Sequence, residues 1–95
     1  MIIQIIKLKS QLSEEELIGV AKERTPMFKA IPGLLQKYYT KLDQPGHYAG
    51  VYVWDSEESL KSYRASDLAA SIPGAYNLLE PPNIEILDVL FRLRE

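Results

Sequence analysis

The stretch LLQKYYTKLDQPGHYAGVYVWDSEES, residues 34–59, decides the fold. Leu34–Lys41 and His47–Trp54 contain β-branched and aromatic residues of the kind that favour strands. The dipeptide Pro-Gly at 45–46 lies between them, and the fixed φ of proline beside the freedom of glycine is typical of a tight turn. The letters DSEE at 55–58 then supply a cap residue, Asp or Ser, and an acidic first turn for a helix. This stretch therefore predicts a β-hairpin that leads directly into a helix.

The chain before this stretch predicts a strand and another helix. Apolar residues fill Ile2–Lys9 and continue on alternate positions, as in a strand with one buried face. Ser13 and Glu16 form a capping box, in which each side chain accepts from the backbone N–H of the other. Because Pro26 disturbs a helix interior, we expect the helix to kink or restart there, with 27–30 as its final turn.

The chain after this stretch predicts the rest of the second helix, a turn and a last strand. Leu60 and Tyr63 give the helix its apolar side, and 71–79 are expected to form a turn with a short helical piece. Two prolines at 81–82 end any helix, and 84–91 have the composition of a strand. The order strand, helix, strand, strand, helix, strand is the split arrangement of the α+β ferredoxin-like fold. Helices cover one face of such an antiparallel sheet, so a second copy is the simplest cover for the other face.

The composition limits the classes of function. Residues 1–95 fit one domain, and a chain without cysteine has no disulfides and no thiolate metal ligands. A single histidine argues against a metal site, and the absence of a dinucleotide fingerprint argues against a bound flavin or other cofactor. A net charge of -2 with scattered basic residues argues against nucleic acid as a partner. The apolar start is too short for a signal peptide or a membrane span, so we expect a cytoplasmic protein that does not enter a membrane.

Three motifs carry a resemblance to a known family. Residues 31–40, IPGLLQKYYT, place Pro-Gly before a strand, residues 50–57, GVYVWDSE, combine a Gly-x-Tyr-x-aromatic strand with an acidic helix start, and Tyr63 follows. They resemble the YdhR-like mono-oxygenases, which belong to the dimeric α+β barrel superfamily together with the antibiotic-biosynthesis monooxygenases. The resemblance is strongest over 31–68, and none of its motifs is a catalytic signature.

This resemblance implies a homodimer whose two sheets close a barrel, with a largely apolar pocket in each subunit. Characterised relatives oxidise aromatic or polyketide-like molecules with dioxygen and no bound metal or flavin. Others are isomerases, haem-degrading enzymes or proteins without known activity, so membership indicates fold better than reaction. Our first hypothesis is a cofactor-independent mono-oxygenase acting on an aromatic or enolisable small molecule. The alternatives are a non-catalytic dimeric module that binds a small apolar ligand, and a proton-transfer isomerase.

Tyr52, Trp54 and His47 are the candidate catalytic residues. The strand period places Tyr52 and Trp54 on one face and His47 on the other. By resemblance, the Trp54 indole could donate to a substrate oxygen, although a core tryptophan explains the residue equally well. Tyr52 could orient substrate or transfer a proton, or simply form a cross-strand aromatic pair. His47 is the one side chain whose ordinary pKa lies near neutrality, but its place after the turn favours a solvated residue.

Tyr38 or Tyr39, Tyr63 and Arg64 are the candidate substrate-binding residues. Either Tyr38 or Tyr39 could line the pocket beside Tyr52. Tyr63 shares a helical stripe with core residues, yet its hydroxyl could reach a pocket rim. Arg64 could hold an anionic substrate, although an exposed helix arginine is the more common case.

Overall fold

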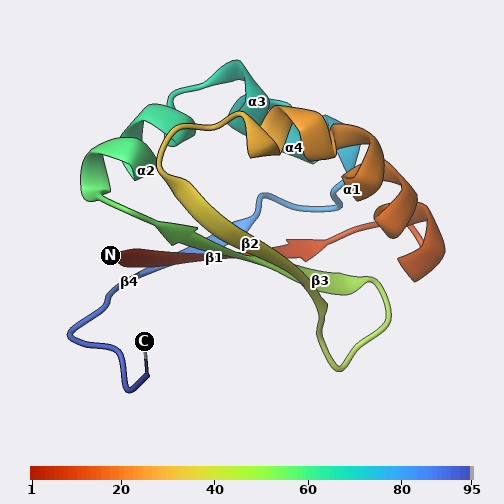
Figure 1. The fold of residues 1–95 in the computed structure, drawn as a ribbon. Helices are drawn as coiled ribbons and strands as arrows, with labels where there is room; N and C mark the ends of the chain where they lie inside the picture. Colours follow the sequence, from red (N-terminus) through yellow and green to blue (C-terminus); the bar gives the residue numbers. More distant parts are fainter. Residues whose placement is uncertain (95) are drawn as a thin grey trace.

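A four-stranded antiparallel sheet carries all the helices on one face in the computed structural model, which describes residues 1–94 (Figure 1). The strand order is β2-β3-β1-β4, with β1 and β3 as the central pair. This arrangement confirms the predicted α+β ferredoxin-like fold. The elements are β1 (Ile2–Lys9), α1 (Glu14–Lys29), β2 (Leu34–Lys41), β3 (His47–Trp54), α2 (Glu57–Arg64), α3 (Asp67–Ala70), α4 (Ile72–Ala75) and β4 (Asn83–Asp88).

The last strand is shorter than predicted. Residues 84–91 were expected to be extended, but β4 ends at Asp88, which pairs with Ile2 at the start of β1. The Val89 N–H still donates to the Met1 carbonyl oxygen at 3.1 Å, one residue beyond the last paired position. The apolar residues that follow Val89 are outside the sheet.

The first helix confirms the capping box and corrects the expected break. The Ser13 Oγ accepts from the Glu16 N–H at 3.2 Å, and the Glu16 Oε1 accepts from the Ser13 N–H at 3.0 Å. The restart at Pro26 was wrong, because α1 runs through the proline as one helix. Phe28, beyond the proline, is only 4% exposed. Burying this ring contributes about 1.5–3 kcal/mol, which offsets much of the cost of an interior proline.

Gly33 allows the chain to pass close to the start of α2. It adopts φ +82°, a left-handed conformation that favours glycine. A Cβ atom there would collide with the Ser59 side chain and lie 2.6 Å from Asp55 Oδ1. The Gly33 carbonyl oxygen also accepts from the Asp55 N–H at 2.9 Å. The Pro-Gly motif therefore fixes where β2 begins relative to the helix that covers it.

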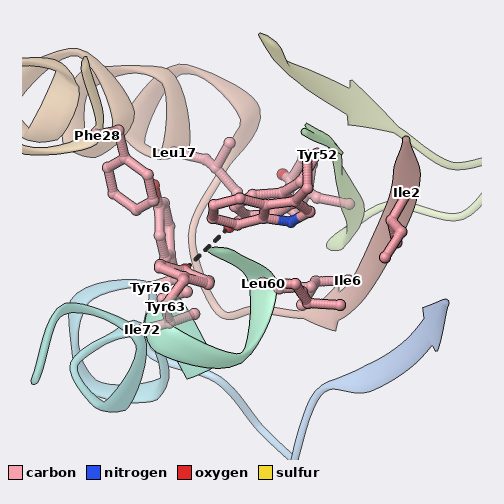
Figure 2. Close-up of a cluster of buried hydrophobic side chains, with 11 residues drawn as sticks. Ile2, Ile6, Leu17, Phe28, Tyr52, Leu60, Tyr63, Ile72 and Tyr76 are labelled. Carbon is pink, nitrogen blue, oxygen red and sulfur yellow. Dashed lines mark hydrogen bonds between the residues drawn. The ribbon is translucent and has the colours of Figure 1, made fainter. Parts of the chain in front are cut away.

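Aromatic rings dominate the core between sheet and helices (Figure 2). Trp54 is fully buried, and Tyr52 and Tyr63 are 2% and 3% exposed. The rings of Tyr52 and Trp54 stack at 6.1 Å between centroids with an interplanar angle of 6°. Tyr63 lies against both, with its centroid 5.6 Å from Tyr52 and 5.3 Å from Trp54. Much of the aromatic side-chain surface of β3 is therefore buried in the core.

The other sheet face carries apolar side chains that no helix covers (Figure 1). Strand pairing places Ile5 opposite Val51 and Val51 opposite Tyr38 on this face. The side chains of Ile5 and Val51 are half-buried, and Tyr38 is 55% exposed. None of the helices in residues 1–94 has the length and apolar character needed to cross a membrane.

Candidate functional site

A small cavity lies between the sheet and the helices, on the same side as the aromatic core. Its volume is about 30 Å³, which is room for one or two water molecules, so the cavity is narrow. Apolar side chains from β1, α1 and α4 form much of the lining, and no carboxylate of residues 1–94 lines it. The polar side chains of the lining are those of Lys37, Tyr39, Thr40, Tyr48, Tyr52 and Tyr76.

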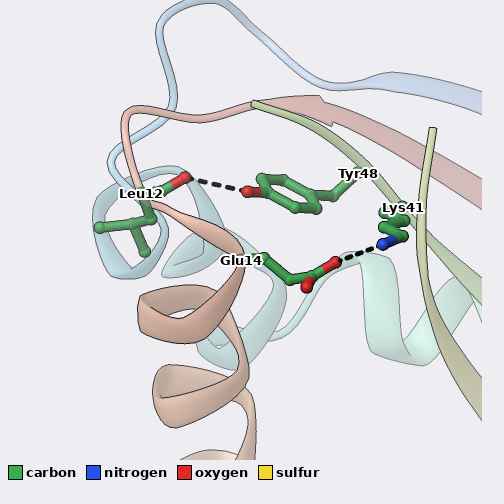
Figure 3. A network of polar contacts seen from close by, with 4 residues as sticks. All are labelled: Leu12, Glu14, Lys41 and Tyr48. Atoms are coloured by element: carbon green, nitrogen blue, oxygen red, sulfur yellow. Dashed lines mark hydrogen bonds and ion pairs between the residues drawn. The ribbon is translucent and has the colours of Figure 1, made fainter. Parts of the chain in front are cut away.

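Beside Tyr48, which lines this cavity, two contacts join the start of α1 to the hairpin (Figure 3). The Tyr48 hydroxyl donates to the Leu12 carbonyl oxygen at 3.0 Å, just before α1 begins. The Lys41 Nζ lies 3.0 Å from Glu14 Oε1, an exposed ion pair worth at most about 1 kcal/mol. Together these contacts hold the start of α1 over the β2–β3 hairpin.

Gly50 makes room for the two side chains that shape the cavity. It lies on β3 opposite Tyr39. A Cβ atom at Gly50 would be 3.0 Å from Tyr52 Cε1 and 3.6 Å from Lys37 Cε. The Gly-x-Tyr motif of this strand therefore has a steric reason, since the Tyr52 ring needs the space that a side chain would fill.

Lys37 places its amine among aromatic rings. Its Nζ lies 3.6 Å from the ring centroid of Phe28, 4.4 Å from that of Tyr39 and 4.5 Å from that of Tyr52. Such cation–π contacts stabilise the charged form. Burial acts against them, and together with the charge of Arg24 it lowers the pKa of Lys37 to about 7. In the part of the chain that the structure describes, no ion pair involves this amine.

The buried tyrosines act as neutral groups. The hydroxyls of Tyr52 and Tyr63 lie 3.3 Å apart and share one hydrogen bond. Burial, and secondarily the neighbouring Tyr63, raises the pKa of Tyr52 far above its usual range. Burial likewise raises the pKa of Tyr76 to about 12, and the Tyr76 hydroxyl is buried without a hydrogen-bond partner. Near neutral pH these phenols can donate a hydrogen bond but cannot serve as bases.

The indole of Trp54 is engaged inside the core. Its Nε1 donates to the Gln4 Oε1 at 3.0 Å, and Gln4 itself is 1% exposed. Trp54 is not among the residues that line the cavity, although Tyr52, which stacks on it, is. This geometry favours the core role of Trp54 over a substrate contact.

The structure divides the other predicted site residues between two faces. Tyr39 lies on the cavity side, whereas Tyr38 points to the uncovered face. His47 is half-buried beside the hairpin turn, and its strand position puts it on the face opposite Tyr52. Arg64 is exposed at the end of α2 and borders a separate groove. Tyr39, Tyr52, Trp54 and Tyr63 therefore come together, and Tyr38, His47 and Arg64 lie apart from them.

Sequence reasoning missed Lys37, Phe28 and Tyr76. The strand period could have identified Lys37, because it lies two residues before Tyr39 and shares its face. No comparable signal marks Tyr76, which follows a four-residue helix in a segment without periodicity.

Comparison with solved structures identifies the fold. Neither a protein-family model nor a curated protein matches the chain. SnoaB, a cofactor-independent oxygenase from Streptomyces nogalater, matches with a TM-score of 0.77 and 14% identity, over 99% of this chain and 97% of that one. An antibiotic biosynthesis monooxygenase matches with a TM-score of 0.73 and 16% identity, over 95% of this chain and 99% of that one. This chain shares the fold of these two proteins.

One structure with this fold contains a small molecule. It is a monooxygenase from the gene ActVA-Orf6 of Streptomyces coelicolor, in complex with the ligand nanaomycin D. Its TM-score is 0.74 at 14% identity, and the match covers 99% of this chain and 91% of that chain. At such identities the likeness establishes the fold, and the chemistry of this chain has to be argued from its own residues.

The lowered pKa of Lys37 leads to a prediction on stability. Between about pH 7 and its ordinary pKa of 10.5, the unfolded chain binds more protons at this site than the folded chain. The free energy of unfolding should therefore rise as pH increases from 7 to about 9, and Lys37→Met should remove that rise. Urea denaturation across this range measures it, with Lys41→Met as the control that keeps the rise. An equal rise in Lys37→Met would contradict the assignment.

Proposed function

We propose that the protein is a cofactor-independent mono-oxygenase of the YdhR-like kind, acting on an aromatic or enolisable small molecule. One observation carries the proposal: the cavity under the helices is aromatic, free of carboxylates and equipped with one amine that titrates near neutrality. The shared fold with an oxygenase that needs no cofactor supports it. Oxygenation of this type needs a dry site and a group that handles the substrate proton.

The proposed chemistry balances without an added reductant. The substrate loses a proton from an activated methylene or phenol, and the resulting anion passes one electron to dioxygen. The radical pair combines to a peroxide anion, which takes back the proton to become a hydroperoxide, and loss of one water molecule leaves a new carbonyl group. For a methylene group, one dioxygen is consumed and one water is released for each carbonyl formed.

A substrate can enter only if the cavity widens, and Tyr39 is the lining residue best suited to move. The closed cavity is well below the roughly 300 Å³ of a typical ligand pocket. Tyr39 is 43% exposed, and no hydrogen bond among the described residues holds its hydroxyl. Displacing this ring and the flexible Lys37 stem would open the cavity beside Phe28, while the buried Tyr52 and Trp54 stay in place.

The remaining features of the proposal follow from the resemblance and the open sheet face. We propose that the chain is one domain that works as a homodimer in the cytoplasm. The apolar face around Ile5, Val51 and Tyr38 would lie in the contact between the two subunits.

Oxygen consumption tests the proposed activity. With a panel of anthrones, naphthols and quinols, we expect uptake above the spontaneous rate for at least one compound. Gly50→Ala should slow it about tenfold or more, because a Cβ there crowds the Tyr52 ring at the cavity wall. Gly19→Ala is the matched control, since nothing lies within 4 Å of the added atom. Spontaneous rates across the whole panel, or equal effects of the two variants, would refute the proposal.

A non-catalytic binding module is the second candidate function. The observation in its favour is that the hydroxyls of Tyr52 and Tyr63 already bond each other and the Trp54 indole bonds Gln4. Three of the predicted site residues are thus engaged in the core. A compound that binds the cavity and is recovered unchanged under air would favour this function.

A further inference from the structure

Lys37 lines the cavity and Arg24 lies close to it, and neither has a carboxylate partner among the described residues. The Lys37 Nζ and the Arg24 Cζ approach the same Phe28 ring, at 3.6 Å and 5.8 Å from its centroid. Arg24 donates from Nη2 to the Ser71 Oγ at 2.6 Å, but its Nε is buried without a partner. No ion pair within residues 1–94 involves either side chain.

This arrangement lacks an anion. A buried positive charge is costly unless a negative group or hydrogen-bond acceptors satisfy it. Tyr76 lines the same cavity, and its hydroxyl is also buried without a partner among the described residues. An oxyanion in the cavity would therefore meet the amine of Lys37, the hydroxyl of Tyr76 as a donor and the field of Arg24.

We propose that the Lys37 amine is the proton acceptor and counter-ion of this cavity, taking the proton of a phenol or enol ligand and holding the anion that remains. The inference rests on the proposed function for the site itself, but it names the residue that performs the first step. The proton moves from the ligand oxygen to the neutral amine, which gives an ammonium and an oxyanion with no net change of charge.

The surroundings of Lys37 make it the fitting base. The titratable or charged groups next to it are Arg24 on α1, Tyr39 on β2 and Tyr52 on β3, and Tyr76 after α4 lines the same cavity. Burial raises the pKa of each of the three tyrosines, so none of them accepts a proton near neutrality. The amine, with a pKa of about 7, is neutral in about half of the molecules at pH 7.

Anaerobic titration with 4-nitrophenol tests this role, because the phenolate form of the probe is yellow. At a pH below the probe's own pKa, the protein should convert bound probe to phenolate, shifting its ionisation constant by about tenfold or more. Lys37→Met should remove the shift, and it should fold, since it replaces a buried charge with an apolar chain of similar length. Lys41→Met, on the same strand and face but paired with Glu14, should behave as the wild type.

Proton uptake separates a proton acceptor from a fixed charge. Above neutrality, binding of the phenolate should draw about one proton from the buffer into wild-type Lys37. Lys37→Arg should bind the phenolate without that uptake, because arginine is already charged. Calorimetry in two buffers of different ionisation enthalpy measures the difference.

Three results would overturn the proposal: no phenolate in the wild type, an unchanged shift in Lys37→Met, or equal proton uptake in Lys37→Arg. Because oxygen is absent, these results do not depend on the oxygenase activity. Phenolate binding without oxygen consumption would refute only the proposed function, and oxygen consumption that survives in Lys37→Met would refute only the role of Lys37.

Discussion

Replacing Trp54 by alanine is expected to lower the free energy of unfolding by about 3 to 5 kcal/mol. The indole is fully buried, stacks on Tyr52 and donates to Gln4, so its removal leaves a cavity and an unpaired amide. The free energy of unfolding of a small domain is only about 5 to 15 kcal/mol, so most of the variant should be unfolded at moderate urea concentrations. Urea denaturation followed by circular dichroism measures the loss.

The conservative variant distinguishes the two roles considered for this residue. Trp54→Phe keeps most of the ring volume but removes the donor to Gln4, which should cost about 1 to 3 kcal/mol. Adding Gln4→Leu should recover part of that loss, because the partner then no longer needs a hydrogen bond. Unchanged stability in Trp54→Phe, together with weaker binding of a cavity ligand, would make Trp54 a substrate contact instead.

Placing a lysine at Val51 is expected to dissociate the homodimer that we propose. Val51 lies on β3, between Ile5 and Tyr38 on the uncovered sheet face. A two-fold interface contains the substituted residue once from each subunit, so dimer formation would bury two unpaired charges. The dissociation constant of the dimer should therefore rise about 100-fold or more. Light scattering at micromolar concentration follows the change in mass.

The control for this variant is Ile18→Lys. Ile18 is an exposed apolar residue on α1, on the opposite side of the molecule from the proposed contact. It should leave the dimer intact. A wild-type protein that is monomeric at micromolar concentration would contradict the dimer proposal altogether.

The fold could be predicted from sequence because its local signals agree with one another. The boundaries of β2 and β3 are those that the turn at 45–46 predicts, and the capping box marks the start of α1. Two local predictions failed because tertiary contacts decided the outcome. Burial of Phe28 keeps α1 continuous through Pro26, and β4 ends where its pairing with β1 ends, at Asp88 opposite Ile2.

The site was harder to predict, because a period of two gives the face of a residue and not its neighbours. Tyr52 and Trp54 were placed on the correct common face, but only the packed structure shows that Gln4 takes the indole N–H. The low pKa of Lys37 likewise depends on burial and on the charge of Arg24, which lies on the helix before this strand. Local pattern does not encode such contacts.

The position of the single tryptophan has a spectroscopic consequence. Trp54 is the only indole in the chain, it is shielded from water, and tyrosine rings lie 5.3 Å and 6.1 Å from it. Its fluorescence therefore reports on one known point of the core, with short-wavelength emission and efficient energy transfer from its tyrosine neighbours. A ligand that displaces Tyr39 would alter the far side of the Tyr52 ring. Trp54 is thus an intrinsic fluorescent probe, separated from the cavity by the Tyr52 ring.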